Sequence, residues 1–201
     1  MLNYNHSAWY WVADDGRIYS SSCQHLIAED DADYVNFIAA GGTPTTWPRD
    51  RAGDQTVTSM LAVVAPYGLI VASSALDACR QIRLSAITSA CGAAIVGGFT
   101  SDALGSLHIY PSQQIDQINL MGSVTDSLLP DLSPDWSTPF WCQDENGAWA
   151  FRQHDALQIQ RVGSDGKAHV VACQTKLAML TAEANSKTNP EEIAAIGWGA
   201  S

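Results

Sequence analysis

The residues that could do chemistry are spread along the chain and form no familiar catalytic or metal-binding motif. Five histidines and five cysteines are present, without a Cys-x-x-Cys pair. Cys142 and His154 flank a predicted hairpin and could meet in space. A structural zinc site takes four ligands, however, and the sequence does not supply the other two. We therefore predict no metal, and we expect the odd number of cysteines to be small buried side chains rather than a disulfide framework.

Three closely spaced carboxylates are the other candidates for chemistry. Asp30, Asp31 and Asp33 lie together, and two carboxylates at a suitable separation can hydrolyse a glycosidic bond. Acidic residues are also favoured at the N-terminus of a helix, where they face the positive end of its dipole. We favour the second interpretation and keep an enzyme acting on glycan as an alternative. Because the phosphate-binding loops and the GxSxG and HExxH motifs are missing, we expect no enzyme and no cofactor.

The charge of the chain limits the partners that it can bind. The sequence has 10 Lys and Arg against 21 Asp and Glu, which gives a formal net charge of −11. An acidic chain neutralises few phosphates, so binding to nucleic acid or to an anionic membrane surface is disfavoured. The first ten residues lack the features of a secretory signal, and the longest apolar stretch, Leu61–Ala72, is too short for a membrane span. Hydrophobic residues make up 46% of the chain, which is enough for a packed core.

The first part of the sequence predicts short strands and one short helix. Asp14-Asp15-Gly16 separates two strand-like runs within residues 8–20, which predicts a hairpin. Asp31 can cap a helix over residues 31–40. Residues 57–72 hold two apolar, β-rich runs around a Pro-Tyr-Gly turn, so we expect a second hairpin that is buried against something, such as another subunit.

From residue 73 onward the hydrophobic pattern changes to the helical period. It predicts three helices, which span residues 73–94, 112–129 and 154–186. Residues 99–112 are expected to form a small hairpin or an ordered loop, and residues 140–152 a hairpin with Asn146-Gly147 at its turn. The fold class is therefore predicted to be α+β. A small β-rich module at residues 1–72 precedes a mainly helical domain with inserted β-hairpins at residues 73–201.

Two of the predicted helices carry patterns that bear on packing. The helix at residues 112–129 has an apolar stripe on one face, formed by Ile115, Ile118, Met121, Val124 and Leu128. The helix at residues 154–186 has a seam close to a heptad repeat, which could join subunits. Gly163 and Gly166 are expected to weaken the first half of that helix by about 1 kcal/mol each relative to alanine.

The sequence is rich in tryptophan, with seven residues of this type. Trp and Tyr are favoured at protein interfaces, where they bury a large area at low entropic cost, and they also fill the cores of small β modules. For Trp9, Trp11 and Trp47 both interpretations stay open. For Trp141 and Trp149, which flank the Asn146-Gly147 turn, one face of the hairpin is expected to be core.

An ordered series of short patterns between about Cys79 and Leu180 resembles a domain of tail-fibre proteins, and of their assembly partners, in tailed bacteriophages and prophages. The first 50 residues are also similar, more loosely, to the N-terminal part of small tail-fibre assembly proteins. There a hairpin precedes a short helix and a Gly-x-x-Pro exit, here Gly41-Gly42-Thr43-Pro44. The patterns of the longer segment are Gly98–Gly105 (GFTSDALG), His108–Ser112 (HIYPS), Asp116–Gly122 (DQINLMG), Trp136 and Pro139–Cys142 (PFWC).

This resemblance implies a tail-fibre assembly protein that binds the phage tail-fibre protein and aids its folding or trimerisation, without catalysis and without a cofactor. The alternative is a structural virion component of the tail fibre or baseplate, such as an adhesin at the fibre tip. The first role places the protein in the host cytoplasm during assembly and the second in the virion tail, and a homo-oligomer is compatible with both. Asp116, Gln117 and Asn119 either hold the local fold or contact a partner. The candidate partner-interface residues are Trp9, Trp11, Trp47, Tyr67, Asp116, Gln117 and Asn119.

Overall fold

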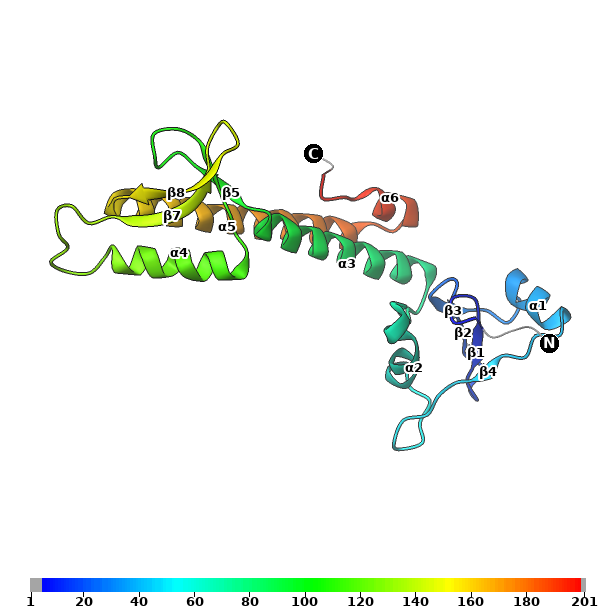
Figure 1. The fold of residues 1–201 in the computed structure, drawn as a ribbon. Helices are drawn as coiled ribbons and strands as arrows, with labels where there is room; N and C mark the ends of the chain where they lie inside the picture. The colour runs from blue at the N-terminus through cyan, green and yellow to red at the C-terminus, as the bar shows by residue number, and fades with distance from the viewer. Residues whose placement is uncertain (1–4, 200–201) are drawn as a thin grey trace. The chain divides into compact units, whose positions relative to one another are not determined.

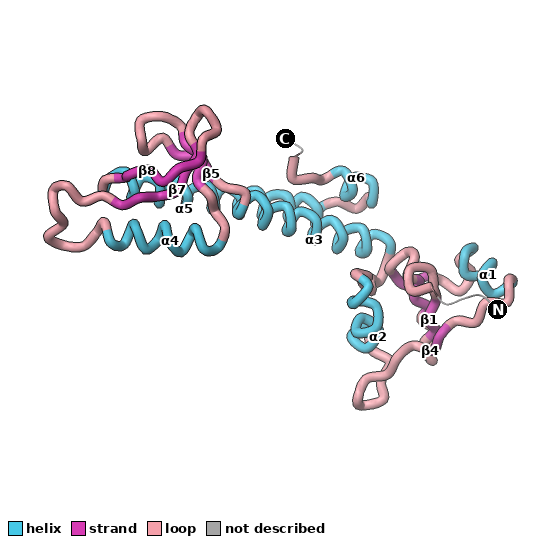
Figure 2. Tube along the Cα trace, in the orientation of Figure 1, coloured by secondary structure: helices cyan, strands magenta, loops and turns pink. Residues whose placement is uncertain are grey.

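The computed structural model describes residues 5–199, and the fold is α+β as predicted. These residues form six α-helices and two four-stranded sheets (Figures 1 and 2). The chain divides into two compact units, Met1–Ser85 with Ala184–Ile196 (unit 1) and Ala86–Glu183 with Gly197–Ser201 (unit 2). The separation of domains at residue 72 stays a prediction. No helix within residues 5–199 combines the length and the hydropathy that a membrane crossing requires.

The sheet of unit 1 consists of four short strands in the order β3-β2-β1-β4. Their bounds are β1 (Tyr10–Val12), β2 (Ile18–Ser20), β3 (His25–Ile27) and β4 (Thr45–Thr46). β4 runs parallel to β1, and the other neighbours are antiparallel. The hairpin predicted at residues 8–20 is confirmed, and Gly16 has a positive φ of 88° in its turn, a conformation that glycine adopts without strain.

One face of this sheet is covered by helix α1 (Ala32–Ala39), where Tyr34 packs against Tyr10 and Ile18. The predicted cap is confirmed, because the Asp31 carboxylate accepts hydrogen bonds from the backbone N–H groups of Asp33 and Tyr34, both at 3.1 Å. This cap also accounts for the acidic cluster, since an acid at a helix N-terminus satisfies N–H groups that have no partner within the helix.

The opposite face is covered by helix α2 (Val57–Val64) and the short 3₁₀ helix η1 (Ala65–Tyr67), so the hairpin predicted at residues 57–72 is wrong. Thr56 and Ser59 form a capping box, in which each backbone N–H donates to the other hydroxyl, at 3.0 and 3.1 Å. Met60 and Val64 then pack into the core of unit 1. The cap and this burial outweigh the β propensity of the run, because strand propensity depends strongly on context.

Two long helices, α3 (Ala75–Val96) and α5 (Ala156–Ser186), confirm the helices predicted there. Their residues in unit 1 are joined by Arg80 of α3, whose Nε donates to the backbone oxygen of Ala184 of α5 at 3.4 Å. Their residues in unit 2 are joined by His169, whose Nε2 lies 3.0 Å from the backbone oxygen of Ala94. A final short helix, α6 (Pro190–Ala195), is capped by Asn189 and buries Ile193 in unit 1.

The sheet of unit 2 is antiparallel, in the order β5-β6-β7-β8. The hairpin predicted at residues 140–152 is confirmed, and residues 99–112 form a hairpin, the first of their two predicted structures. Its strands are β5 (Phe99–Ser101), β6 (His108–Tyr110), β7 (Thr138–Gln143) and β8 (Trp149–His154), and helix α4 (Gln114–Asp126) lies between β6 and β7 in the sequence. The core contains Phe140 and Cys142 from the sheet and Ile159 and Val162 from α5. α4 contributes Leu120 to the same core.

Candidate partner-binding surface on the sheet of unit 2

His154 is fully buried in unit 2, and both of its ring nitrogens have hydrogen-bond partners. Tyr110, Cys142 and His154 are all fully buried, and the Tyr110 hydroxyl lies 2.9 Å from Nε2 of His154. Nδ1 of His154 lies 2.8 Å from the backbone oxygen of Arg152. Because a carbonyl oxygen can only accept, Nδ1 carries the proton and Nε2 accepts from the tyrosine. No group of three or more metal-ligating side chains occurs within residues 5–199.

Burial sets the protonation of this cluster. Burial lowers the pKa of His154, and the nearby His108 lowers it further. Burial also raises the pKa of the Cys142 thiol and that of the Tyr110 hydroxyl. All three groups are therefore neutral near pH 7. The Arg152 guanidinium opposes the effect of burial on the Cys142 thiol, but the thiol lacks the accessible surroundings of a reactive cysteine. The cluster rigidifies the core, and it offers no opening to a substrate.

The three tryptophans proposed from the sequence for a partner interface lie in the core of unit 1 instead. Trp9, Trp11 and Trp47 are only 8%, 2% and 1% exposed, so they are removed from any surface that a partner could contact while this core is intact. Their burial follows from the covering of the sheet by α2, whose Met60 and Val64 belong to the same cluster. Of the two interpretations, the structure supports core packing.

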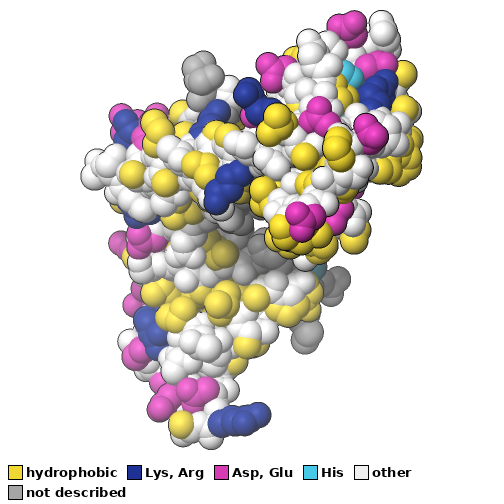
Figure 3. Space-filling view, turned by 90° about the vertical axis from the view of Figure 1, so that its left-hand side faces the viewer, with side chains coloured by type: hydrophobic (Ala, Val, Ile, Leu, Met, Phe, Trp, Pro, Cys, Tyr) yellow, Lys and Arg dark blue, Asp and Glu magenta, His cyan; other side chains and the backbone are white. Residues whose placement is uncertain are grey.

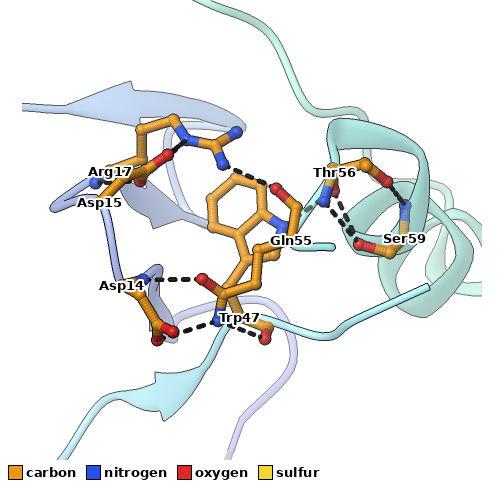
Figure 4. A network of polar contacts seen from close by, with 7 residues as sticks. All are labelled: Asp14, Asp15, Arg17, Trp47, Gln55, Thr56 and Ser59. Atoms are coloured by element: carbon orange, nitrogen blue, oxygen red, sulfur yellow. Dashed lines mark hydrogen bonds and ion pairs between the residues drawn. The ribbon is translucent and has the colours of Figure 1, made fainter. Parts of the chain in front are cut away.

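A polar network holds Trp47 in place (Figure 4). Its indole N–H donates to the backbone oxygen of Thr56 at 2.8 Å, and the Arg17 guanidinium lies over its ring, 4.9 Å from the centroid. Gln55 accepts from the backbone N–H of Asp14 at 2.7 Å and donates to the backbone oxygen of Trp47 at 3.0 Å. The network ties the loop before α2 to the turn of the first hairpin, which is a structural role.

Tyr67 is the one candidate of unit 1 that reaches the surface. Its side chain is half exposed and stacks on the ring of His6, with centroids 4.2 Å apart. It stays a predicted contact residue of unit 1.

The outer side of the sheet in unit 2 carries exposed apolar side chains. We call it the aromatic face and define it as Ile109, Trp141, Trp149 and Phe151. Trp141 and Trp149 are each 40% exposed and Phe151 is 69% exposed. The indoles stack with centroids 6.2 Å apart, and the Phe151 ring meets Trp141 edge-on at 4.9 Å. The strand register explains the arrangement, because Trp141 lies opposite Phe151, and Gln143 lies opposite both Trp149 and Ile109.

The two faces of the β7–β8 hairpin therefore differ. Phe140, Cys142 and His154 point to the buried side, and the two tryptophans point to the open side. One face of the hairpin is core, as predicted. With aromatic side chains of about 150–250 Å² each, the three exposed rings present roughly 300 Å² of apolar surface, the size at which patches are often functional. Figure 3 shows hydrophobic side chains gathered in groups on the surface of the protein, with charged side chains between them.

A groove of about 810 Å³ adjoins the aromatic face. One wall is formed by α4, with Asp116, Ile118 and Asn119, and the other includes Trp141 and Phe151. Two of the residues proposed from the sequence, Asp116 and Asn119, are thus brought together beside the aromatic rings. We call this feature the α4 groove.

The polar residues at the start of α4 have local roles as well. The Asp116 carboxylate accepts from the backbone N–H of Gln113 at 2.9 Å, which caps the helix. The Gln117 amide donates to the backbone oxygen of Ser112 at 2.8 Å. Gln117 does not line the α4 groove but a second hollow of about 440 Å³, whose walls come largely from α4 and α5. Capping and side-chain hydrogen bonding therefore explain Asp116 and Gln117, and Asn119 is the member of the trio left for partner contact.

The apolar stripe predicted for α4 does not form the buried face of this helix. Ile115, Ile118, Met121 and Leu128 are exposed, and the helix packs through Leu120 and Val124. Gly163 of α5 makes room for this contact, because a Cβ atom there would lie 2.7 Å from Cγ2 of Val124. The glycines that seemed only to weaken α5 are sites of close packing, and small residues in a long helix are the signal that could have revealed them.

Another contact was recognisable from spacing alone. His169 and Cys173 lie four residues apart on α5, and Nε2 and Sγ are 3.8 Å apart. Both are engaged with α3, because Sγ of Cys91 also lies 3.6 Å from the backbone oxygen of Cys173. The pair joins the two long helices and forms no open site.

Comparison with known protein families gives a match over more than half of the chain. The family described as a domain of unknown function (DUF4376) matches residues 78–197, which include α4, the aromatic face and the α4 groove. No curated protein and no solved structure matches the chain.

Proposed function

The chain belongs to the DUF4376 family of unknown function, and we propose that it is a bacteriophage tail-fibre assembly protein that binds the tail-fibre protein through the aromatic face and the α4 groove. The observation that carries the proposal is the uncovered aromatic face. Aromatic residues are enriched at protein interfaces, and rigid rings bury a large area there at low entropic cost.

The physics of fibre folding supports a chaperone-like role for such a surface. Long β-rich trimers depend on non-local pairing, so they fold slowly and expose apolar strands while they do so. A preformed apolar face beside a groove can shield such a strand until the trimer closes. The charge of −11 keeps the protein in solution while it carries this face.

The binding surface also defines the chemistry of the segment that it holds. The rings provide apolar contacts, and Asp116 and Asn119 line the groove beside them. We therefore expect an extended fibre segment with apolar side chains and with polar groups that can hydrogen-bond the amide of Asn119. In this role the protein works in the host cytoplasm during assembly.

The test is coexpression of the tail-fibre protein of the same phage with this chain and with two matched variants. Trp141→Ser removes a ring from the aromatic face. Val171→Ser removes an apolar side chain of similar exposure from α5, outside the aromatic face and the α4 groove. We expect the unaltered chain and Val171→Ser to raise the yield of soluble trimeric fibre, and Trp141→Ser to lose most of that effect. A fibre that folds and trimerises equally well alone contradicts the proposal.

Mass spectrometry of purified virions separates this role from that of a structural virion component. A transient assembly protein is absent from the mature particle. A stoichiometric copy number in the tail supports instead a component of the fibre or baseplate, such as an adhesin at the fibre tip.

A further inference from the structure

Strand β8 forms one edge of the sheet in unit 2, and its hydrogen-bonding pattern shows which of its peptide groups face away from the sheet. The backbone N–H of Asp144 donates to the oxygen of Ala148 at 3.1 Å, so this pair is hydrogen-bonded. In an antiparallel ladder hydrogen-bonded pairs alternate with non-hydrogen-bonded ones. Along the register of β7 and β8, the next bonded pairs are therefore those of Ala150, Arg152 and His154. The peptide groups of the intervening residues, Trp149, Phe151 and Gln153, point outward.

This edge lacks the usual protection against pairing. Natural sheets protect their edges with lysine, proline, bulges or very short strands. β8 has six residues, its register with β7 is continuous, and its sequence WAFRQH contains no lysine, proline or glycine. Its one arginine, Arg152, is held by Asp144 at 2.6 Å. The side chains of the three residues with outward peptide groups are all exposed.

We propose that β8 pairs antiparallel with β8 of a second copy of this chain, about a twofold axis beside Phe151. In this register Phe151 lies opposite Phe151 of the other copy, and Trp149 lies opposite Gln153. All outward peptide groups then meet as hydrogen-bonded pairs, each of which exchanges two bonds. On the other side of the strand, Arg152 lies opposite Ala150.

The pairing fits a second copy because the strand is complementary to itself. A twofold interface requires one patch to match its own inverted image, and here each facing pair is aromatic with aromatic, aromatic with amide, or cation with alanine. No like charges meet, although the whole chain is strongly acidic. The two aromatic faces become one continuous face on the same side of the joined sheets. This inference does not depend on the proposed function.

The size of the contact sets the expected strength. A standard interface buries about 800 Å² on each partner, and one pair of six-residue edges with its neighbouring rings lies at the low end of that class. We therefore expect a dimer that dissociates on dilution. The amides of Trp149, Phe151 and Gln153 are expected to exchange more slowly with deuterium as the concentration rises.

The test is sedimentation of the full chain over a wide range of concentration, with three variants checked for folding by circular dichroism. Phe151→Lys and Phe151→Glu each place like charges opposite one another and are expected to weaken dimerisation at least about tenfold. Mixing these two variants restores opposite charges, and a mixed dimer is expected to form. Trp141→Lys changes the same face on β7, away from the edge, and is expected to leave dimerisation intact.

Several outcomes overturn the inference. An unaltered chain that stays monomeric at every concentration contradicts the pairing, as does a Phe151→Lys variant that dimerises normally. Failure of the mixed variants to associate, with the unaltered chain dimeric, contradicts the twofold axis beside Phe151. Protection of the β8 amides by the fibre protein alone would assign this edge to a foreign strand. Because Trp141→Lys alters the proposed fibre-binding face but not the edge, the two proposals fail separately.

Discussion

Both sheets of the molecule carry tryptophans on their strands, yet one sheet buries them and the other displays them. In unit 1, Trp9 and Trp11 are enclosed by α2, and Tyr10 on the opposite side is enclosed by α1. In unit 2, the inner side of the sheet packs on α5, and no described residue covers the outer rings of Trp141 and Trp149 to the same extent. The strands of the two sheets differ little in aromatic content, so the helices that cover each sheet decide whether a ring is buried or exposed.

This difference shows where an interface can lie. The sheet of very short strands in unit 1 is covered by helices on both sides, so little of it remains for a partner. The longer β7–β8 hairpin is stabilised by its inner face alone, which leaves the outer face free to bind. Trp9, Trp11 and Trp47 of unit 1 therefore contribute to folding, and Trp141 and Trp149 of unit 2 stay exposed.

The largest expected effect tests this division of roles. Trp47→Ala should reduce the free energy of unfolding of unit 1 by about 3–5 kcal/mol, because it leaves a cavity in the core. Trp149→Ala removes a ring that is already 40% exposed and should cost about 1 kcal/mol or less. Urea unfolding, combined with hydrogen exchange of β1 and β7 peptides, measures the loss of stability in each variant. Equal costs for the two substitutions would contradict the comparison.

The next effect concerns the close contacts within unit 2. Gly166→Ala adds a Cβ atom 2.9 Å from the ring of Phe99, and this overpacking should cost about 1–3 kcal/mol, partly offset by the higher helix propensity of alanine. Gly92→Ala in α3 is the matched control, because nothing lies within 4 Å of its added Cβ atom. It should stabilise the chain by about 0.5–1 kcal/mol. Changes of the same sign at both positions would show that Gly166 is not a packing site.

Local sequence signals predicted most of the fold. Asp15-Gly16 and Asn146-Gly147 marked hairpins whose turns require positive φ, and Asp31 marked a helix cap. The prediction for residues 57–64 was wrong because an apolar run rich in valine shows neither a clear helical nor a clear strand period. Its outcome was decided by the Thr56–Ser59 cap and by the space beside Trp47, and the second of these is a tertiary contact that sequence does not display.

The site was less predictable, for a related reason. Asp116 and Asn119 were singled out and do line the α4 groove, but nothing in the sequence tells which face of α4 is buried. Both Leu120 and Ile118 are apolar, and only the packing of Val124 on Gly163 selects the first. The alternation of side chains along a strand could have predicted that Trp141 points to the opposite face of the sheet from Phe140 and Cys142. It could not have shown that the outer face stays uncovered.

A smaller effect sharpens the account of unit 1. Thr56→Ala removes one half of the capping box and should cost about 1 kcal/mol, because the backbone N–H of Ser59 loses its acceptor. Thr58→Ala, at an exposed position of the same helix, is the control and should change stability by less than about 0.5 kcal/mol. Hydrogen exchange of the first amides of α2 reports the loss directly. Unchanged exchange in Thr56→Ala would mean that core packing alone starts this helix.

The last effect appears only on acidification and separates the cores of the two units. Burial lowers the pKa of His154 below its ordinary value of 6.5, His108 acts in the same direction, and Asp155 opposes them. Below about pH 6.5 the unfolded chain therefore binds a proton that the folded chain resists, so this contribution to stability is present above that pH and is lost as the pH falls toward the lowered pKa. Urea unfolding at a series of pH values should show a decline in the stability of unit 2 that His154→Gln reduces. The same decline in both proteins would assign it to other groups and leave the contact between Tyr110 and His154 without a role in the acid response.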